Sequence, residues 1–167
     1  MHSLSIKSVG IILIVALAIT GAVFIAGSIM IRTNTTEAVI IWDQYQNESS
    51  RKARAVDALV RNLGLGGMIH DFKNYILRQD KERIPKILKA ANASLAALNE
   101  YAATGVDEAE SQAISSIQNV INRYKTETHK IEDMVKAGND ARAIDKVVNI
   151  NDTPALKGVA TLVKSIA

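Results

Sequence analysis

Hydrophobic residues follow two different patterns along this chain. Residues 9–31, VGIILIVALAITGAVFIAGSIMI, form an apolar run of 23 residues without a single charged side chain. A helix of that length spans about 34 Å, enough for a bilayer hydrocarbon core of roughly 30 Å. A cleavable signal peptide has a shorter apolar core, of about 7–15 residues, and ends in a small-residue cleavage site. The pattern therefore predicts a retained transmembrane helix over residues 9–31, preceded by a short N-terminal segment, residues 1–8.

From residue 32 onward, apolar residues recur every three or four positions, which is typical of amphipathic helices packed in a bundle. Short polar or glycine-containing breaks divide this part into four long helices and one short piece. Asp107 and Thr153 are suitable N-caps, and Gly138 with Asn139 suits a helix C-terminus. The predicted helices cover residues 35–79, 82–103, 107–137 and 153–167, with a short amphipathic piece at 140–148.

The seam residues of the two middle helices are spaced like those of a coiled-coil-like bundle. In the second helix they are Ile84, Leu88, Ala91, Leu95, Leu98 and Ala102. In the third helix they are Ile114, Ile117, Ile121, Tyr124, Thr128, Ile131 and Val135. Because short turns force neighbouring helices to run antiparallel, we predict an all-α fold in which residues 32–167 form an up-down four-helix bundle.

The predicted helices differ in length. The first has about 45 residues, or about 67 Å, whereas the fourth has about 15 residues before the chain stops at Ala167. The apolar positions of the fourth helix that are still in phase there are Leu156, Val159, Leu162, Val163 and Ile166. We therefore expect the last helix to be truncated and the chain to be the N-terminal piece of a longer protein. A continuation of about 30 residues would return the fourth helix to the membrane.

Composition supports a helical chain and excludes several classes of protein. The 167 residues include no cysteine, two prolines and 4% aromatic residues, which excludes disulfides and cysteine-based metal sites. A net charge of +3 without a basic stripe gives no indication of nucleic-acid binding. No motif of a catalytic nucleophile, a phosphate-binding loop or a zinc protease occurs, so we predict that the chain is not an enzyme. The carboxylates that are spaced as solvated helix faces are Glu108, Glu110, Glu127, Glu132 and Asp133.

One stretch, GLGGMIHDFKNYILR at residues 64–78, interrupts the regular pattern with three glycines and a group of polar residues. If the helix continues through it, His70 and Asn74 point into the bundle and the opposite apolar face packs against a second copy. If the glycines break the helix, the apolar face rotates inward and the polar group moves to the rim. We favour the continuous helix, since an apolar face next to glycines suits a dimer contact. That apolar face comprises Leu65, Met68, Ile69, Phe72 and Ile76.

The same stretch is the predicted binding site. Its glycines would leave room for a ligand, and its polar side chains would supply hydrogen-bond donors suited to a small anion or carboxylate. The ligand-binding residues would be Gly66, Gly67, His70, Lys73, Asn74 and Arg78. The alternative is a structural polar pair, in which His70 and Asn74 set the register of the bundle.

A metal or haem shared between two histidines is a second alternative. His70 lies ten residues before the turn at Asp80, and His129 lies nine residues before Gly138. Parallel first and third helices would bring both imidazoles to about the same height. His129 lies one position off its seam in a polar stretch, so we predict no bound cofactor and no metal site.

The apolar N-terminal segment, the helix that follows it without a break, and the bundle together resemble a family of bacterial receptors. The segments GGMIHDFKNYILR and NDTPALKGVATL are similar to stretches of its members. The chain resembles the four-helix-bundle periplasmic sensing module of methyl-accepting chemotaxis receptors, a module also used in membrane histidine kinases and diguanylate cyclases. The resemblance covers the whole chain in architecture, and these two segments at the level of residues.

The resemblance implies a homodimer in the bacterial inner membrane, with residues 1–8 in the cytoplasm and the bundle in the periplasm. It also implies a second span and cytoplasmic signalling partners, reached through a C-terminal part that follows the bundle. The charges by themselves leave the orientation open, because Lys7 precedes the apolar run and Arg32 follows it.

The sequence therefore predicts an extracytoplasmic sensor module of a transmembrane, chemoreceptor-like signal transducer. It would bind a small polar or anionic solute and relay a small helix shift across the membrane. Two alternatives come from other classes: a helical-bundle protein that binds haem or a metal, and a single-span adaptor without a ligand, whose helices bind partner helices.

Overall fold

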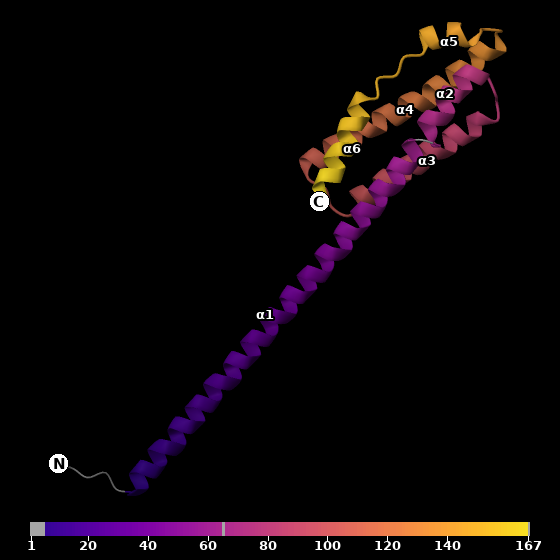
Figure 1. The fold of residues 1–167 in the computed structure, drawn as a ribbon. Helices are drawn as coiled ribbons and strands as arrows, with labels where there is room; N and C mark the ends of the chain where they lie inside the picture. The colour runs from indigo at the N-terminus through magenta and orange to yellow at the C-terminus, as the bar shows by residue number, and fades with distance from the viewer. Residues whose placement is uncertain (1–5, 65, 167) are drawn as a thin grey trace. The chain divides into compact units, whose positions relative to one another are not determined.

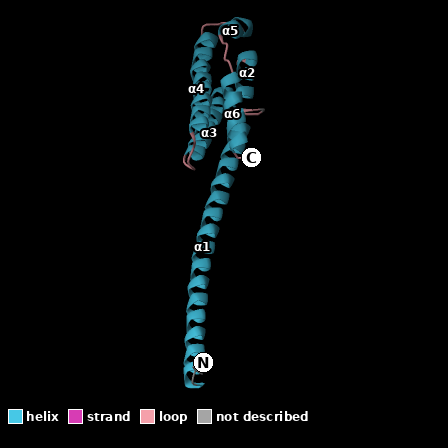
Figure 2. Cartoon of the chain, turned by 90° about the vertical axis from the view of Figure 1, so that its left-hand side faces the viewer, coloured by secondary structure: helices cyan, strands magenta, loops and turns pink. Residues whose placement is uncertain are grey.

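The computed structural model of the chain describes residues 6–64 and 66–166, which form helices joined by short turns and loops. Within these ranges, the side chains of residues 6, 8, 9, 12, 27 and 29–37 are not described. The helices are α1 (Ile6–Leu63), α2 (Met68–Arg78), α3 (Arg83–Ala102), α4 (Glu108–Lys136), α5 (Ala141–Val147) and α6 (Thr153–Ser165), as Figure 1 shows. The described ranges contain no strand (Figure 2), so the predicted all-α class is confirmed.

The chain divides into two compact units, residues 1–46 and 47–167, and α1 runs through the division. In the first unit, the large apolar side chains that the structure describes are exposed all round the helix. They include Ile11, Leu13, Ile14, Val15, Leu17, Ile19, Val23, Phe24 and Ile25. Within the described residues, no helix combines the length and the hydropathy needed to cross a membrane. The predicted span also contains residues 9, 12, 27 and 29–31, whose side chains lie outside the described ones.

The second unit is a bundle in which successive long helices are neighbours in space. α2 packs against α3, α3 against α4 and α4 against α6, while the short α5 contacts α2. Figures 1 and 2 both show α4 and α6 side by side, with α5 at one end of the bundle. The largest side chains that are almost fully buried in the core are Leu59, Met68, Phe72, Tyr75, Ile87, Leu98, Tyr101, Ile117, Ile121, Tyr124, Ile131 and Ile144.

The ends of α4 follow the local signals of the sequence. At its start, the Asp107 carboxylate accepts a hydrogen bond from the Glu110 N–H, and the Glu110 carboxylate accepts one from the Asp107 N–H. This reciprocal pair is a capping box, which satisfies two N–H groups that lack partners within the helix. At its end, Gly138 has a φ of +81° and its N–H donates to the Val135 carbonyl, as a helix C-terminus of this kind requires. Both predicted helix ends are confirmed.

The prediction of one continuous helix over residues 35–79 is wrong. α1 ends at Leu63, and α2 begins at Met68. Gly66 has a φ of +83°, and a Cβ on Gly67 would lie 2.2 Å from the Asn62 carbonyl oxygen. The glycines therefore permit a left-handed turn and a close backbone contact that other residues would resist. Predicted Leu65 lies outside the described residues.

The buried faces of α4 and α3 agree with the predicted seams to different degrees. On α4, every predicted seam residue is buried except Val135, which is partly buried. On α3, the predicted Ile84, Leu88 and Leu95 are only half-buried, and Ala102 is exposed. The predicted Ala91 and Leu98 are buried, and the other buried residues of α3 are Ile87, Ser94, Ala97 and Tyr101, which were not predicted. α3 is thus rotated about its axis relative to the predicted orientation. Small and apolar residues occupy two adjacent stripes of this helix, and packing against its neighbours determines which stripe is buried.

The last helix packs through two small residues and a leucine. Ala155, Gly158 and Leu162 are its buried positions, whereas Leu156 is 66% exposed. A Cβ on Gly158 would lie 2.8 Å from the Ala113 carbonyl oxygen, so the glycine allows α6 to approach α4 closely. The predicted N-cap of this helix is displaced by one residue, since Asp152 takes that position and Thr153 is already helical.

Candidate functional site

The polar group predicted as a binding site lies on the surface of α2. His70, Lys73 and Arg78 are exposed, and Asn74 is half-buried. The Asn74 Nδ2 donates to the His70 carbonyl oxygen at 2.9 Å and lies 3.0 Å from the His70 Nε2. The favoured interpretation, in which His70 and Asn74 point into the bundle, is therefore wrong. The alternative is confirmed, because the break at the glycines turns the apolar face of α2 inward.

Three of the predicted ligand-binding residues share a surface hollow. His70, Lys73 and Asn74 line it together with Gly64, Ile69 and Leu77, and its volume is about 330 Å³. The predicted Arg78, Gly66 and Gly67 do not line this hollow. The two glycines shape the backbone of the break instead of opening space for a ligand. Apart from Gly64, every residue that lines this hollow belongs to α2.

Among the interactions described for this chain, none joins the two candidate metal-binding histidines, His70 and His129. His129 is exposed on α4, in the neighbourhood of Glu132, and the described hydrogen-bond partner of His70 is Asn74. Over the described parts of the chain, no group of three or more His, Cys, Asp or Glu residues is placed to hold a metal ion.

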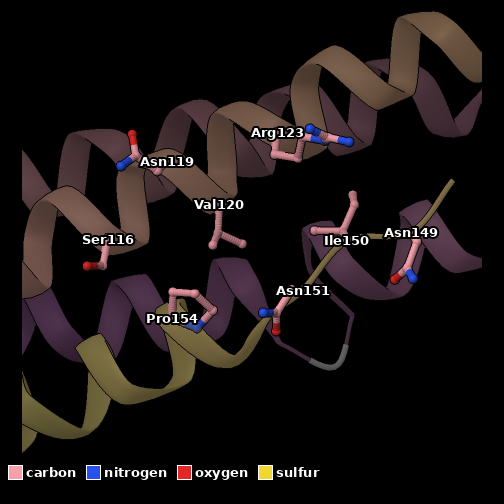
Figure 3. A pocket seen from close by; sticks show the side chains of 8 residues that line it. All are labelled: Ser116, Asn119, Val120, Arg123, Asn149, Ile150, Asn151 and Pro154. Carbon is pink, nitrogen blue, oxygen red and sulfur yellow. The ribbon is translucent and has the colours of Figure 1, made fainter.

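A second polar site lies where α4 faces the segment between α5 and α6. It is a cleft of about 420 Å³ whose residues come from both sides, as Figure 3 shows. They are Ser116, Asn119, Val120, Arg123, Asn149, Ile150, Asn151 and Pro154. Ser116, Asn119, Val120 and Arg123 share one face of α4, because they are spaced by three and four residues along the helix.

The segment opposite α4 is held in place at both ends. Val148 is buried at the end of α5, and the Asp152 carboxylate accepts a hydrogen bond of 2.8 Å from the Tyr124 hydroxyl. Next to Asp152, the Asn151 Oδ1 accepts a hydrogen bond of 3.0 Å from the Thr153 N–H. A hollow of about 580 Å³, lined partly by Lys157, continues along the same α4–α6 face.

Arg123, at the edge of the cleft, is paired with a buried carboxylate. Its Nε lies 2.9 Å from the Glu127 Oε1, and the Lys130 Nζ lies 3.6 Å from the Glu127 Oε2. Glu127 is only 4% exposed, and its Oε2 has no hydrogen-bond partner. The expectation that Glu127 belongs to a solvated face is wrong, because the bundle covers this position while its two cationic partners reach out toward solvent.

Glu110 is the second carboxylate that the sequence analysis placed on a solvated face and that the structure buries. Its Oε1 lies 2.7 Å from the Lys52 Nζ and accepts a hydrogen bond of 2.6 Å from the Tyr101 hydroxyl. Burial alone would raise the pKa of Glu110, but hydrogen bonds from Lys52, Tyr101 and the Asp107 N–H outweigh it and lower the pKa. Burial and the adjacent carboxylate raise the pKa of Tyr101.

We call Lys52, Tyr101 and Glu110 the Glu110 cluster. It joins three helices, α1, α3 and α4. The Lys52 ammonium also lies 5.1 Å from the centre of the Tyr101 ring, within the range of a cation–π contact. The Tyr101 hydroxyl lies 3.5 Å from the Leu162 carbonyl oxygen of α6, so the cluster touches every long helix of the second unit except α2.

Sequence reasoning missed the residues of the cleft. The asparagine-rich stretch NIND at residues 149–152 was a usable signal, since such residues concentrate in turns and in polar sites. The contact itself joins residues about thirty positions apart, and helical periodicity carries no information on contacts of that range.

Comparison with protein-family models, with curated proteins and with solved structures finds no match for this chain. The resemblance to receptor sensing modules therefore stays a prediction, and the function has to be inferred from the sites.

Proposed function

We propose that this chain is the membrane anchor and extracytoplasmic sensor module of a transmembrane signal transducer, resembling a chemoreceptor, that binds a small polar or anionic solute. The main support is α1, a single helix from Ile6 to Leu63 that contains both the apolar run and part of the bundle core. Ala55, Val56 and Leu59 of this helix are buried in the bundle. In this proposal, a small displacement of α1 carries the signal.

The anchor is proposed from the surface of the first unit. Large apolar side chains surround the helix, with Leu17 68% exposed and Phe24 76% exposed. A helix that is apolar on all sides needs a nonpolar environment, and lipid supplies one while the helix satisfies its own backbone hydrogen bonds. The proposal places this helix in a bacterial inner membrane and the bundle in the periplasm.

Signalling would consist of a small shift of α1. The Glu110 cluster and the buried side chains of α1 hold the helix against α3 and α4. A solute changes that position only if it binds one packing arrangement of the bundle more tightly than another.

The homodimer is proposed from apolar residues at the end of the first unit. Ile41, Trp42 and Tyr45 are all more than half exposed, and Ile41 and Tyr45 lie one helical turn apart. A second copy would cover them. Because the chain has no cysteine, a single Ile41→Cys substitution tests this contact cleanly. We expect a disulfide-linked dimer in oxidised membranes, and no more dimer than with an exposed Ala160→Cys control would oppose the proposal.

Membrane extraction and solute binding test the proposal as a whole. The full chain should stay in the membrane fraction after carbonate washing and dissolve only in detergent. A periplasm-specific reporter fused after Ala167 should be active. The detergent-solubilised chain should be stabilised in a thermal-shift assay by at least one member of a panel of amino acids, organic acids and inorganic anions. Extraction by carbonate, or an inactive reporter, would contradict the sensor topology.

The same preparations distinguish the proposed sensor from two alternative functions. A haem or metal protein would show a Soret band or a stoichiometric metal, which we do not expect. A ligand-free adaptor is favoured by exposed apolar residues that suit a partner helix, namely Val39, Ile40, Ile41, Trp42 and Tyr45. The adaptor would be membrane-bound but indifferent to every solute of the panel.

A further inference from the structure

We infer that the cleft between α4 and residues 149–154 is the solute site, and that its ligand is a small organic acid held by Arg123. This inference rests on the proposed sensor function and names the ligand class of that sensor. The cleft has walls on two separate parts of the chain, so a ligand in it can draw them together. The hollow beside His70 has no such second wall.

The hydrogen-bonding groups of the cleft favour an oxyanion. The Asn151 Oδ1 is already used by the Thr153 N–H, which leaves the Asn151 amide nitrogen as the group available to a ligand. Asn119 and Asn149 add further amides, and Arg123 adds the donors of its guanidinium. Among the described residues that line the cleft and the adjoining hollow, none is acidic, and Lys157 adds a second cation. An excess of donors together with positive charge suits a carboxylate.

Arg123 is oriented before any ligand arrives. Its side chain is 59% exposed, yet its Nε is paired at 2.9 Å with Glu127, whose side chain is only 6% exposed. The pair uses one edge of the guanidinium, and the terminal nitrogens can bind a carboxylate in the fork geometry that arginine favours. Because the pairing limits the positions of a long side chain, less entropy is lost when the ligand binds. Glu127 is therefore a positioning residue.

The remaining walls set the size of the ligand. Val120 is buried in the α4 side of the cleft, and Figure 3 shows its side chain directed toward the segment 149–154. Ile150 and Pro154 line the opposite side. A volume of about 420 Å³ with these three apolar side chains suits a short hydrocarbon skeleton that carries a carboxylate and polar substituents.

Binding assays on matched variants test the inference. The detergent-solubilised full chain is titrated with short mono- and dicarboxylic acids, hydroxy acids and amino acids, each beside its neutral carboxamide. At least one acid should bind, and its carboxamide should not. Arg123→Gln should raise the Kd of that acid about ten- to a hundred-fold. Lys130→Gln removes the other cationic partner of Glu127 without touching the cleft, and should change the Kd less than about two-fold.

Two further variants separate a ligand contact from a structural role. Arg123→Lys keeps the charge but loses the fork, so it should recover only part of the affinity. Asn119→Ala, at an exposed position, should weaken binding without changing the melting temperature of the unliganded chain. An acid that binds Arg123→Gln as tightly as the wild type would overturn the inference and leave the sensor proposal standing. Failure of every acid, or equal binding of its carboxamide, would overturn the inference as well, while the sensor topology is judged by the extraction and reporter results.

Discussion

Glu110 and His70 are both polar residues on helices of the second unit, but their surroundings are opposite. Glu110 is 3% exposed, and its partners come from α1, α3 and the turn before α4. His70 is exposed, and its described partner, Asn74, is one turn further along the same helix. A single helix can form the second arrangement on its own, whereas only the folded bundle can form the first.

The comparison separates polar contacts that stabilise the fold from those that do not. A buried carboxylate without partners is strongly unfavourable, so every contact to Glu110 matters for the free energy of unfolding. A polar contact within one exposed helix contributes only about 0.2–0.5 kcal/mol. Substitutions on the exposed face of α2 should therefore change the free energy of unfolding little. The Glu110 cluster, in contrast, holds α1 against the rest of the bundle.

Breaking the Glu110 cluster should have the largest effect. Lys52→Met leaves a buried carboxylate without its cation, and should lower the free energy of unfolding by about 3–5 kcal/mol. Urea unfolding of the detergent-solubilised chain, followed by circular dichroism, measures the change. Lys73→Met on the exposed face of α2 is the matched control, with an expected change below about 0.5 kcal/mol. Equal losses in the two variants would show that burial is not the deciding difference. The double variant Lys52→Met/Glu110→Gln should recover most of the loss.

The break before α2 should be the next most sensitive point. Gly67→Ala would place a Cβ 2.2 Å from the Asn62 carbonyl oxygen, so the backbone must move, at a cost of about 3 kcal/mol. Gly66→Ala meets no atom within 4 Å and only strains a residue with a φ of +83°, which costs about 1 kcal/mol. The difference between the two melting curves measures how far close packing, rather than φ alone, sets the orientation of α2. Two indistinguishable melting curves would show that the backbone φ angle, and not close packing, sets the orientation of α2.

Acid should weaken the fold partly through Glu110. Its pKa is lowered from the ordinary value of 4.5, so the folded state favours the charged carboxylate. Its contribution is present above the unfolded pKa and is lost as pH falls through the lower folded pKa. Between about pH 5 and pH 3, the free energy of unfolding should therefore fall less steeply in Glu110→Gln than in the wild type. Parallel pH profiles of the two proteins would exclude this contribution.

The smallest effect is expected at His70, the exposed residue that was compared with Glu110. His70→Ala and Asn74→Ala remove an exposed contact within α2 and should change the free energy of unfolding by less than about 0.5 kcal/mol. Both variants should also keep the affinity for organic acids, since neither residue lines the cleft. A large rise in Kd in either variant would move the solute site back to the hollow on α2.

Much of the helical framework could be predicted from local sequence. The turn after α2, the capping box of Asp107 and the glycine C-terminus of α4 depend on neighbouring residues alone, and each is present. The seam of α4 was also readable, because its isoleucines recur along one stripe with polar residues elsewhere. Three of the predicted ligand-binding residues line one hollow on α2, but the prediction that His70 and Asn74 point into the bundle was wrong.

Tertiary structure decided which of two adjacent stripes faces inward. On α3, Tyr101 is buried where Ala102 was expected, and on α2 the apolar face containing Phe72 turned inward once the glycines had broken the helix. Helical periodicity reports the angle between residues of one helix but not the rotation of that helix about its axis. Neighbouring helices set that rotation by packing.

By itself, the sequence determined most of the helices, both ends of α4 and the apolar run that we propose as an anchor, because each depends on interactions over a few residues. Only the folded chain decided that Glu110 and Glu127 are buried, and that Arg123 and Asn151 line one cleft. These arrangements join residues far apart in the sequence. Their energies come from desolvation and pairing, which exist only after the helices have packed.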